Sequence, residues 1–439
     1  MTTTNLAMLI KQYLVDQAII ARNILDVSLP LRRLRKKSAH LQPVSGEKRF
    51  LILPSDPVAP SGSMGEMAML SGLTQTLRTQ HPDAKFTLVG TRSHEITLPG
   101  VGEVEVVPAW TGRDGSLAFD QLIRQHHALF GLGADVLDGK YGAALVCRFV
   151  SYCNHAVRLG IPATIIGFSF NSTPRRPAVH SLSRLHPDVR VNVRGQPSLR
   201  RFTKSVGTAA TLCADVAFLM APSLETEAET EGWLNEMRIA GRIPVGVNMS
   251  AHAFSQVISI IGADALAARM AQELSKAAEH DSLAYLLMPH DVKSQSGDIT
   301  LLRALEKSLN ALGMGHVRYV LQTDPARIKR VAGLLDLVIT GRMHLAIAAL
   351  GMKTPILSIT YQDKFEELYQ VFNLPQEDIV QSQHCVTNAL SEHISRAIAR
   401  RSTTAALITK NMPSVQRLAE QNLVLGEQSQ LFHPHARKS

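Results

Sequence analysis

Short apolar runs alternate with longer amphipathic segments along most of the chain, starting at Arg49. The first series of apolar runs is RFLILP, KFTLVG, VEVVPAW, ATIIGFSF, VRVNVRG and CADVAFLM. The second is IPVGVNMS, LAYLLMPHD, VRYVLQ, LDLVITGR and TPILSITY, separated by helical segments such as 263–280 and 298–313. Strands of a parallel sheet read as continuous apolar runs because helices cover both of its faces. The pattern predicts an α/β protein with two parallel-sheet domains.

The boundary between the two series lies in an acidic stretch. Residues 221–242 interrupt the alternation and carry four glutamates, Glu225, Glu227, Glu229 and Glu231. We therefore predict an N-terminal domain at 46–222, a linker at 223–242 and a C-terminal domain at 243–390. Residues 391–439 are predicted to form a polar helical tail, which could pack back on the first domain.

Ahead of the first strand lies an N-terminal extension, residues 1–45, that is predicted to form an amphipathic helix. Its apolar stripe has helical spacing and is made of Leu6, Ile10, Tyr13, Ile20, Ile24, Val27 and Leu31. The basic segment LRRLRKKS follows directly. Two interpretations stay open. The segment could lie on an anionic membrane surface, or the helix could pack on the protein body with a solvated basic linker after it.

Composition narrows the class of protein. Hydrophobic residues make up 45% of the 439 positions and charged residues 19%, which is typical of a globular chain and excludes disordered and disulfide-scaffold classes. The formal net charge of +9 favours anionic ligands, anionic lipid or nucleic acid as partners. Nucleic acid is the weakest of these, because aromatic residues are only 5% of the chain and no basic segment is interleaved with them.

The cysteines and the length of the apolar runs indicate in which cellular compartment the protein is expected. The four cysteines form no CxxC pair and are too few for a disulfide framework, so we expect reduced thiols in the cytoplasm. No apolar run approaches the roughly 20 residues that span a bilayer, and no signal peptide is recognisable. We expect neither secretion nor membrane spanning, and no bound metal.

The strongest candidate for chemistry is the segment TGRMHLAIAALGMKTPILSITYQDK, residues 340–364. Arg342 and His344 follow a buried strand and open a helix, where backbone N–H groups and the helix dipole favour an anion. A guanidinium adds bidentate recognition of carboxylate or phosphate, and an imidazole could move a proton beside it. The alternative is that Arg342 forms a structural salt bridge and His344 caps the helix.

This segment resembles the signature of the polysaccharide pyruvyl transferase family. The shared features are a strand leading to Arg-x-His, an alanine-rich helix, a proline-led strand and Tyr-x-x-Lys, here Tyr361 and Lys364. Other motifs of the family occur in the same order, over roughly residues 49–375. They are a Gly-rich turn with Gly62, Ser63, Gly65 and Glu66, then Arg194 and Ser198, Asp215 to Phe218, and Pro289 to Asp291.

The resemblance implies two Rossmann-like domains that face each other across a cleft, as in the glycosyltransferase-B class. It also implies transfer of pyruvate from phosphoenolpyruvate to a sugar of a surface polysaccharide, or of its lipid-linked precursor, as a ketal. In the family the Arg of Arg-x-His grips the donor and the His takes part in the chemistry, which maps onto Arg342 and His344. Arg194 matches a second donor-binding arginine.

The chemistry of phosphoenolpyruvate fits these residue types. Its carboxylate and phosphate call for two cationic groups, which Arg342 and Arg194 supply. His344 is the first candidate for the acid and base steps, and His290 or Asp291 is a candidate base for the sugar hydroxyl. The alternative for His290 and Asp291 is a turn or helix cap. Further substrate-binding candidates are Tyr361, Lys364, Ser63, Glu66 and Asp138; Asp138, in the glycine-rich segment 131–139, could instead hold a turn.

Two other functions remain open from the sequence. One is a nucleotide-sugar glycosyltransferase of the same architecture, with Arg342 and Lys364 on the diphosphate. The other is a non-catalytic polysaccharide-assembly protein that docks at the membrane through residues 5–37. For the main interpretation we expect phosphoenolpyruvate as co-substrate, no resident cofactor and no nucleic-acid partner. We expect a cytoplasmic protein, with attachment of residues 5–37 to the inner face of the membrane left open.

Overall fold

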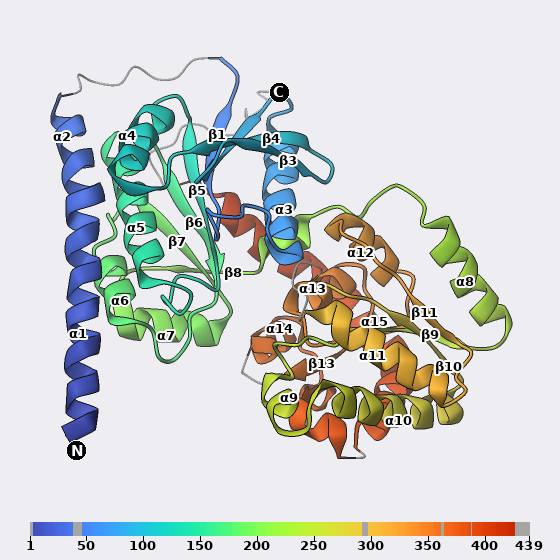
Figure 1. Ribbon diagram of the computed structural model, residues 1–439. Helices are drawn as coiled ribbons and strands as arrows, with labels where there is room; N and C mark the ends of the chain where they lie inside the picture. The colour runs from blue at the N-terminus through green and yellow to red at the C-terminus, as the bar shows by residue number, and fades with distance from the viewer. Residues whose placement is uncertain (1–2, 38–45, 292–296, 361–363, 388, 426–439) are drawn as a thin grey trace. The chain divides into compact units, whose positions relative to one another are not determined.

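The computed structural model describes residues 3–37, 46–291, 297–360, 364–387 and 389–425. The chain divides into two compact units (Figure 1). Unit 1 comprises Met1–Ser61, Leu73–Val216 and Leu418–Ser439, and unit 2 comprises Gly62–Gly72 and Ala217–Arg417. Each unit is built around one sheet, so the prediction of two α/β domains with parallel sheets is confirmed.

Unit 1 contains an eight-stranded sheet in the order β3-β4-β2-β1-β5-β6-β7-β8. Apart from the β3–β4 pair at one edge, which is antiparallel, neighbouring strands run parallel. In the centre, Leu51 of β1 lies opposite Thr87 of β2 and Leu129 of β5. The strands are β1 (Arg49–Leu53), β2 (Lys85–Gly90), β3 (His94–Leu98), β4 (Gly102–Pro108), β5 (Ala128–Ala134), β6 (Ala163–Phe168), β7 (Val189–Arg194) and β8 (Thr211–Cys213).

Helices cover this sheet and bury its apolar side chains. They are α1 (Thr3–Asn23), the π-helical turn η1 (Ile24–Ser28), α2 (Leu29–Lys37), α4 (Gly112–Ile123), α5 (Ala143–Arg158), α6 (Arg176–Leu182), α7 (Gln196–Val206) and the short η5 (Gln421–Leu423). Helix α3 (Met64–Gln80) begins in unit 2 and ends in unit 1.

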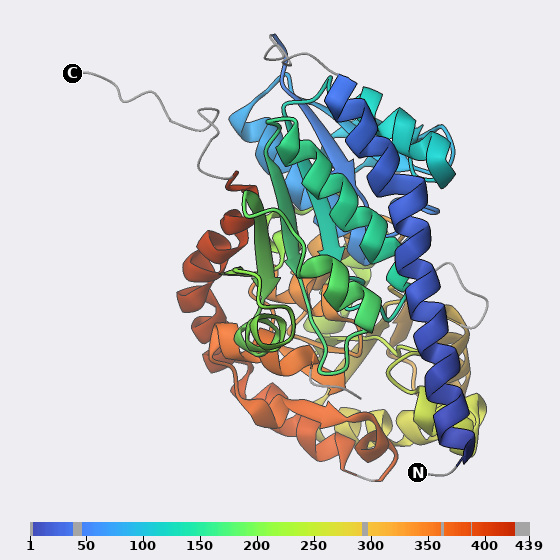
Figure 2. The same cartoon turned by 90° about the vertical axis from the view of Figure 1, so that its left-hand side faces the viewer.

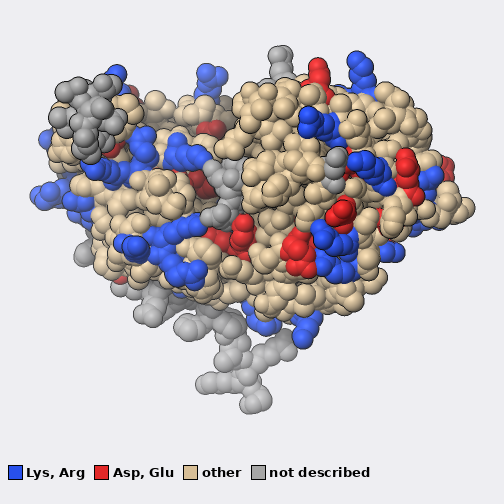
Figure 3. All heavy atoms as spheres, turned by 90° about the horizontal axis from the view of Figure 1, so that it is seen from below, with Lys and Arg blue, Asp and Glu red and all other residues tan. Residues whose placement is uncertain are grey.

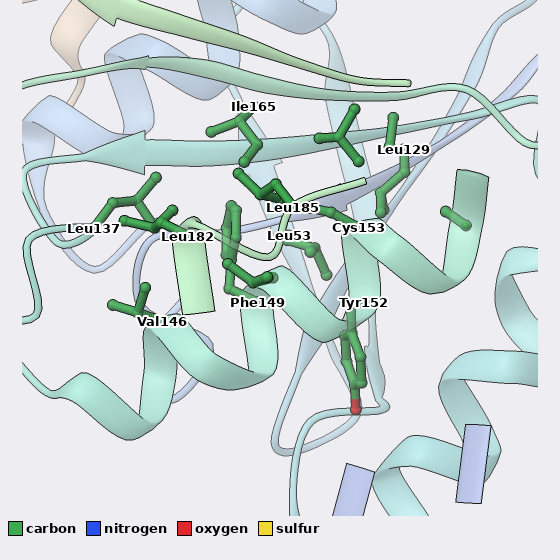
Figure 4. Packing of buried hydrophobic residues seen from close by; sticks show 14 of the residues in the cluster. Leu53, Leu129, Leu137, Val146, Phe149, Tyr152, Cys153, Ile165, Leu182 and Leu185 are labelled. Atoms are coloured by element: carbon green, nitrogen blue, oxygen red, sulfur yellow. The ribbon is translucent and has the colours of Figure 1, made fainter. Parts of the chain in front are cut away.

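Figure 4 shows the core of unit 1, where α5 packs on the central strands. A Cβ on Gly131 of β5 would overlap the ring of Phe149, which extends from α5. The glycine at this position therefore lets the Phe149 ring lie close to the strand. Tyr152 stacks on Phe119 with ring centroids 3.8 Å apart, and its hydroxyl donates to the carbonyl of Ala109 at 2.8 Å. Apolar burial and a satisfied polar tip fix α5 to the sheet.

The N-terminal helix packs on unit 1 through its C-terminal part. Val27 and Leu31 are buried in the core of unit 1, and α1 runs alongside α5 and α6 (Figures 1 and 2). Part of the predicted stripe stays exposed, however, including Ile10 and Tyr13, each with about half of its surface accessible. The structure therefore gives the helix a packed portion and an exposed apolar portion, instead of one buried stripe.

Unit 2 contains a six-stranded, fully parallel sheet in the order β11-β10-β9-β12-β13-β14. Its strands are β9 (Ile243–Val247), β10 (Leu283–Leu287), β11 (Val317–Tyr319), β12 (Leu337–Thr340), β13 (Ile356–Thr360) and β14 (Ile379–Gln381). Its α-helices are α8 (Ala228–Ile239), α9 (Ser255–Ile261), α10 (Ala263–Asp281), α11 (Asp298–Ala311), α12 (Pro325–Ala332), α13 (Met343–Gly351), α14 (Lys364–Phe372) and α15 (Leu390–Glu420), whose last residues, from Leu418, belong to unit 1. Short 3-10 turns are η2 (Val216–Leu219), η3 (Gln376–Asp378) and η4 (Ser382–Val386).

Several details differ from the sequence pattern. The run CADVAFLM forms a strand only up to Cys213, and Val216–Leu219 is a 3-10 turn. The pattern missed β3, β5 and β14. The predicted linker 223–242 contains α8, whereas the tail, which the pattern predicted to be helical, contains α15. The first turns of α15 pack into the core of unit 2 through Leu390 and Ile394, whereas Asn422 accepts a hydrogen bond from the backbone N–H of Gly167 in unit 1.

The surface reflects the positive net charge. The face in Figure 3 exposes Lys and Arg side chains more often than Asp and Glu side chains. None of the described helices is both long enough and apolar enough to cross a membrane.

Candidate functional site

Polar side chains gather in unit 2 where three neighbouring strands end. Asn248 follows β9, His290 and Asp291 follow β10, and Arg342 follows β12. In parallel sheets the carboxyl ends of the strands form the usual ligand-binding edge. The motifs at 289–291 and 342–344, which lie about fifty residues apart in the sequence, therefore meet at one edge of the sheet.

The buried carboxylate of Asp298 joins these residues. It is fully buried at the start of α11 and accepts hydrogen bonds from Arg342 Nη2 at 2.7 Å and Nε at 3.1 Å. It also accepts the backbone N–H groups of His290 and Asp291, each at 3.1 Å, and Asn248 Nδ2 at 2.8 Å. A carboxylate can accept from this many donors, which an uncharged side chain of the same size cannot. Asp298 thus fixes both the guanidinium and the turn after β10.

Arg342 is held in place and only partly exposed. Its backbone N–H donates to Thr340 Oγ1 at 2.9 Å, and its Nη2 also donates to Asp291 at 3.0 Å. Burial opposes the charge of the guanidinium, but the Asp298 and Asp291 carboxylates raise the pKa of Arg342 above its ordinary value. The side chain keeps 23% of its surface accessible. Arg342 therefore forms the salt bridge that the sequence left as an alternative, and it still reaches the surface.

Two imidazoles lie beside this cluster. His290 and His344 line the same small pocket, together with apolar residues that include Ala68 and Met220. Burial lowers the pKa of His290 to about 3, and the proximity of His344 and of the Arg342 guanidinium acts in the same direction. Within the described residues, neither ring nitrogen of His290 has a hydrogen-bond partner. A buried polar ring without partners is rare in a purely structural role.

The glycine-rich turn at the start of α3 meets His344. A Cβ built on Gly65 would overlap the imidazole of His344, so this position requires a glycine for close approach. Ser63 Oγ accepts the backbone N–H of Glu66 at 3.1 Å and caps the helix, and the Glu66 side chain is buried. Ser63 and Glu66 therefore lie near one predicted catalytic residue, and their role in binding substrate stays a prediction.

Arg194 lies in unit 1, at the end of β7. Its guanidinium is buried and forms an ion pair with Asp215, a bond to the Ala134 carbonyl at 2.6 Å and one to Ser169 Oγ at 3.2 Å. Burial opposes its charge, but Asp215 raises the pKa of Arg194. The Arg194 and Asp215 motifs of the sequence therefore bind each other. Binding of the donor by Arg194 stays a prediction.

The other predicted substrate-binding residues have different surroundings. Asp138 of unit 1 accepts the backbone N–H of Lys140 at 2.8 Å and the amide of Asn171, so it holds the turn between β5 and α5. Lys364 begins α14, and Tyr361 lies outside the described residues. Their roles stay predictions. Across the described residues, no group of three His, Cys, Asp or Glu side chains is arranged to hold a metal ion.

Sequence reasoning missed Asp298, Asn248 and Thr340. Asp298 has the form of an ordinary acidic residue in the first turn of a helix. Thr340 and Asn248 directly follow or end apolar runs, at positions that are polar in many α/β proteins. Their positions at strand or helix ends could have marked all three as candidates. Only the folded sheet shows that they share one hydrogen-bond network.

Solved structures with the same fold are distant in sequence. A protein from Listeria monocytogenes assigned as a UDP-N-acetylglucosamine 2-epimerase is 9% identical, with 86% of this chain and 95% of that chain covered and a TM-score of 0.52. An α,α-trehalose-phosphate synthase from Burkholderia xenovorans is 12% identical, with 86% and 99% covered and a TM-score of 0.50. These matches show the two-domain α/β fold of glycosyltransferase-B enzymes. No curated protein matches the sequence.

A family model identifies the region that holds the site. The polysaccharide pyruvyl transferase model matches residues 149–363, a shorter range than the motif resemblance suggested. Arg194, His290, Asp298, Arg342 and His344 all lie within it. The resemblance drawn from the motifs is confirmed over residues 149–363, which match the model of the polysaccharide pyruvyl transferase family.

Proposed function

We propose that the protein transfers pyruvate from phosphoenolpyruvate to a sugar of a surface polysaccharide, or of its lipid-linked precursor, and forms a pyruvate ketal. The observation that carries the proposal is the Arg342 guanidinium, fixed by Asp298 next to His290 and His344 within the family-matched region. The reaction uses phosphoenolpyruvate as co-substrate and calls for no resident cofactor.

Arg342 has one face available for the donor. Its Nε and Nη2 bind Asp298 and Asp291, whereas Nη1 makes no hydrogen bond to any described residue. Asp291 is the more exposed of the two carboxylates, with 36% of its side chain accessible compared with 0% for Asp298. We infer that the donor's carboxylate or phosphate binds Nη1 and replaces Asp291 at Nη2. Asp298 keeps the guanidinium in place during this exchange.

The exchange gives Asp291 a second role. Once released from Arg342, its carboxylate is the candidate that accepts the proton of the attacking sugar hydroxyl. His344 is the candidate that protonates the methylene carbon of phosphoenolpyruvate, which makes C2 electrophilic. His290 is neutral at neutral pH because its pKa is low, and a bound anionic donor would raise that pKa toward the working range of a base.

The proposed reaction needs no oxidant or reductant. One sugar hydroxyl adds to C2 and loses its proton, while C3 gains one proton and becomes a methyl group. The C2–O bond to phosphate then breaks, and inorganic phosphate leaves with the bonding electron pair. A second hydroxyl of the same sugar adds to C2 and loses its proton, which closes the cyclic ketal. The net products are the ketal and inorganic phosphate.

The test uses the full chain with phosphoenolpyruvate and a panel of nitrophenyl and lipid-linked sugars. We expect phosphate release that depends on the sugar, together with a product whose mass increases by pyruvate minus water. His344→Gln should lower kcat by about a hundredfold or more, because a proton-transferring group acts mainly in the transition state. His280→Gln, at an exposed position on α10 of the same unit, is the matched control. Turnover of a nucleotide sugar without consumption of phosphoenolpyruvate would favour the glycosyltransferase alternative.

We also propose that α1 attaches the protein to the inner face of an anionic membrane. Its exposed apolar side chains include Met8 and Leu14, with 72% and 60% of their surface accessible, and the basic helix α2 follows on the same segment. The double variant Met8→Gln, Leu14→Gln should weaken binding to vesicles of phosphatidylglycerol and phosphatidylcholine without lowering Tm. Leu312→Gln, which changes an exposed leucine of unit 2, is the control. Equal vesicle binding by all three proteins would refute the attachment.

A further inference from the structure

A cavity lies in unit 1 where the N-terminal segment packs on α5. Its volume is about 430 Å³, and it is lined from one side by η1 and α2 and from the other by α5. The donor site proposed above is in unit 2, so this cavity belongs to a different part of the protein. A pocket of several hundred cubic ångströms is within the size range of small-molecule sites.

Three arginines line the cavity. Arg32 and Arg35 extend from α2, and Arg158 is the last residue of α5. Within the described part of the chain, none of the three forms a hydrogen bond or an ion pair. Burial lowers the pKa of Arg158, and the charges of Arg35 and Arg32 lower it further, so the three guanidinium groups repel one another. An anion bound among them would relieve this repulsion.

The acidic residue that contacts the cavity wall, Asp120, is paired with residues other than the three arginines. His155 lines the cavity, and its Nε2 lies 2.7 Å from Asp120 Oδ1. Asp120 also accepts two hydrogen bonds from Arg124, at 2.8 and 2.9 Å. Its carboxylate is therefore occupied by Arg124, which caps α4, and by His155 of α5, and it makes no hydrogen bond to Arg32, Arg35 or Arg158 among the described residues.

Hydrogen bonds hold the N-terminal segment against α5 beside the cavity. Asn23 Nδ2 donates to Ser151 Oγ at 3.0 Å, and the hydroxyls of Ser28 and Ser151 lie 3.2 Å apart. These bonds join the end of α1 and the π-helical turn η1 to the middle of α5. Turns of π-helix occur frequently at functional sites because they widen the helix locally. Here the turn keeps Ile24 and Ser28 in the wall of the cavity.

The cavity also has an apolar side. Ile24 and Leu29 contribute to its wall, and Ile24 keeps 45% of its surface accessible. Leu25, the next residue of the turn, is 64% accessible. An inorganic anion would use the arginines alone and would leave these apolar side chains in water. A ligand with an anionic head and an apolar chain would contact both surfaces.

We propose that this cavity binds a phosphate or diphosphate group that carries an apolar chain. The phosphate oxygens accept hydrogen bonds from Arg32, Arg35 and Arg158, and the chain lies along Ile24 and Leu25 toward the exposed apolar side of α1. Two sources share this chemistry, a phospholipid headgroup of a bilayer and a free lipid-linked phosphate. The experiment below measures binding of a ligand and not turnover, so its result does not depend on which group the protein transfers.

The test is isothermal titration calorimetry of the full chain with inorganic pyrophosphate and with geranyl diphosphate. We expect geranyl diphosphate to bind about tenfold more tightly than pyrophosphate, because part of its chain leaves water. Arg35→Gln and Arg158→Gln should each weaken geranyl diphosphate binding by about tenfold or more, since each removes a charge-assisted contact. Arg158→Lys, which keeps the charge, should retain part of the affinity. Thermal unfolding checks that each variant is folded.

Arg33→Gln is the matched control, because Arg33 is an exposed residue of α2 that does not line the cavity. It removes the same charge from the same helix and should leave affinity within about twofold. If Arg33→Gln and Arg35→Gln lose the same affinity for geranyl diphosphate, the ligand is attracted to the whole basic segment and not to the cavity. This result would overturn the proposal. Absence of binding by the wild-type chain would also overturn it, as would binding that Arg342→Lys removes and Arg158→Gln does not.

A second arm distinguishes the two sources. Vesicles of phosphatidylglycerol and phosphatidylcholine are mixed with the wild-type chain, Arg158→Gln and Arg33→Gln, and bound protein is measured by flotation. If Arg158→Gln loses both vesicle and geranyl diphosphate binding, the ligand is a bilayer headgroup. If it keeps vesicle binding and loses geranyl diphosphate binding, the ligand is a free lipid-linked phosphate. Either result supports the cavity as the phosphate site.

Discussion

The buried Asp298 carboxylate forms an ion pair with the partly exposed Arg342 guanidinium, with Nη2 2.7 Å from Oδ1 and Nε 3.1 Å from the same oxygen. Arg342 follows β12 and Asp298 opens α11, so the pair connects two elements that are distant in sequence. The oxygens of Asp298 also hold the turn that carries His290 and Asp291. One buried carboxylate thus positions the Arg342 guanidinium, the Asn248 amide and the turn of His290 and Asp291.

The first prediction concerns Asp298→Asn. An asparagine cannot replace the carboxylate, because its amide group would face the donors of Arg342 or of the backbone. We expect the free energy of unfolding of unit 2 to fall by about 3 kcal/mol, the usual result of breaking a buried pair. The KM for phosphoenolpyruvate should rise by about tenfold or more, because Arg342 is no longer fixed.

Unfolding of unit 2 can be measured separately. The chain has two tryptophans, Trp110 in unit 1 and Trp233 in unit 2, so in a Trp110→Phe background the fluorescence reports on unit 2. Asp336→Asn is the control, because Asp336 is paired with Arg238 at the surface, and it should cost about 1 kcal/mol or less. An Asp298→Asn protein as stable as this control would show that the buried pair does not hold unit 2 together.

The sequence predicted the sheets well where their strands are apolar throughout, as in RFLILP and LDLVITGR. It missed β5, a central strand, because Gly131 and Gly133 have low strand propensity and the reason for them is tertiary. Gly131 leaves room for Phe149, and a Cβ on Gly133 would meet Phe168. It missed β3 because this edge strand is mostly exposed and carries polar residues.

The candidate site was also predictable from the sequence only in part. Arg342 and His344 were predicted because a motif and a strand end coincide at them. Asp298 was not, because a single acidic residue in the first turn of a helix is common and its partner lies 44 positions away. The partnership between Arg194 and Asp215 was also invisible, since each belongs to its own motif and only the sheet of unit 1 places them together. Long-range pairs of this kind depend on topology that one sequence does not specify.

The second prediction tests the approach of Gly65 to His344. Gly65→Ala adds a methyl group where the imidazole lies, so His344 must move. We expect kcat to fall by about tenfold or more, because a misplaced catalytic group loses its geometry. The measurement is phosphate release from phosphoenolpyruvate with a sugar acceptor.

Gly232→Ala provides the control for this change. Gly232 is a helical glycine of α8, and a Cβ there meets no atom within 4 Å. The change should stabilise unit 2 by up to about 1 kcal/mol through helix propensity and leave kcat unchanged. Full activity in Gly65→Ala would show that the position of His344 is not required for turnover.

The third prediction concerns the attachment of the C-terminal segment to unit 1. The side chain of Asn422 is fully buried, accepts the backbone N–H of Gly167 at 2.7 Å and donates to the carbonyl of Ala214 at 2.9 Å. Asn422→Ala leaves both backbone groups buried without these bonds. We expect unit 1 to lose about 2–4 kcal/mol of unfolding free energy, and amide hydrogen exchange in β6 to accelerate.

Asn310→Ala, an exposed change in α11, serves as the reference and should leave exchange in β6 unaltered. If Asn422→Ala exchanges at the wild-type rate in β6, the C-terminal segment does not stabilise the sheet of unit 1.

The last prediction follows from the low pKa of His290. In the folded protein this pKa is about 3, because burial disfavours the charged ring, whereas an imidazole in the unfolded chain has a pKa near 6.5. Between these two values the unfolded chain binds a proton at His290 and the folded chain does not. The stability of unit 2 is therefore retained above about pH 6.5 and falls as the pH drops toward 3, by about 1.4 kcal/mol per pH unit for this one group.

A His290→Gln protein lacks this contribution. Between pH 7 and pH 5 the wild-type unit 2 should lose about 2 kcal/mol more unfolding free energy than His290→Gln, whatever the stability of the variant at pH 7. Urea unfolding at both pH values, followed through Trp233 in the Trp110→Phe background, gives the two differences directly. His280→Gln, with its exposed ring, should keep the wild-type difference. If His290→Gln keeps it as well, His290 is protonated in the folded state above pH 5, and the neutral ring assigned to it in the proposed reaction is wrong.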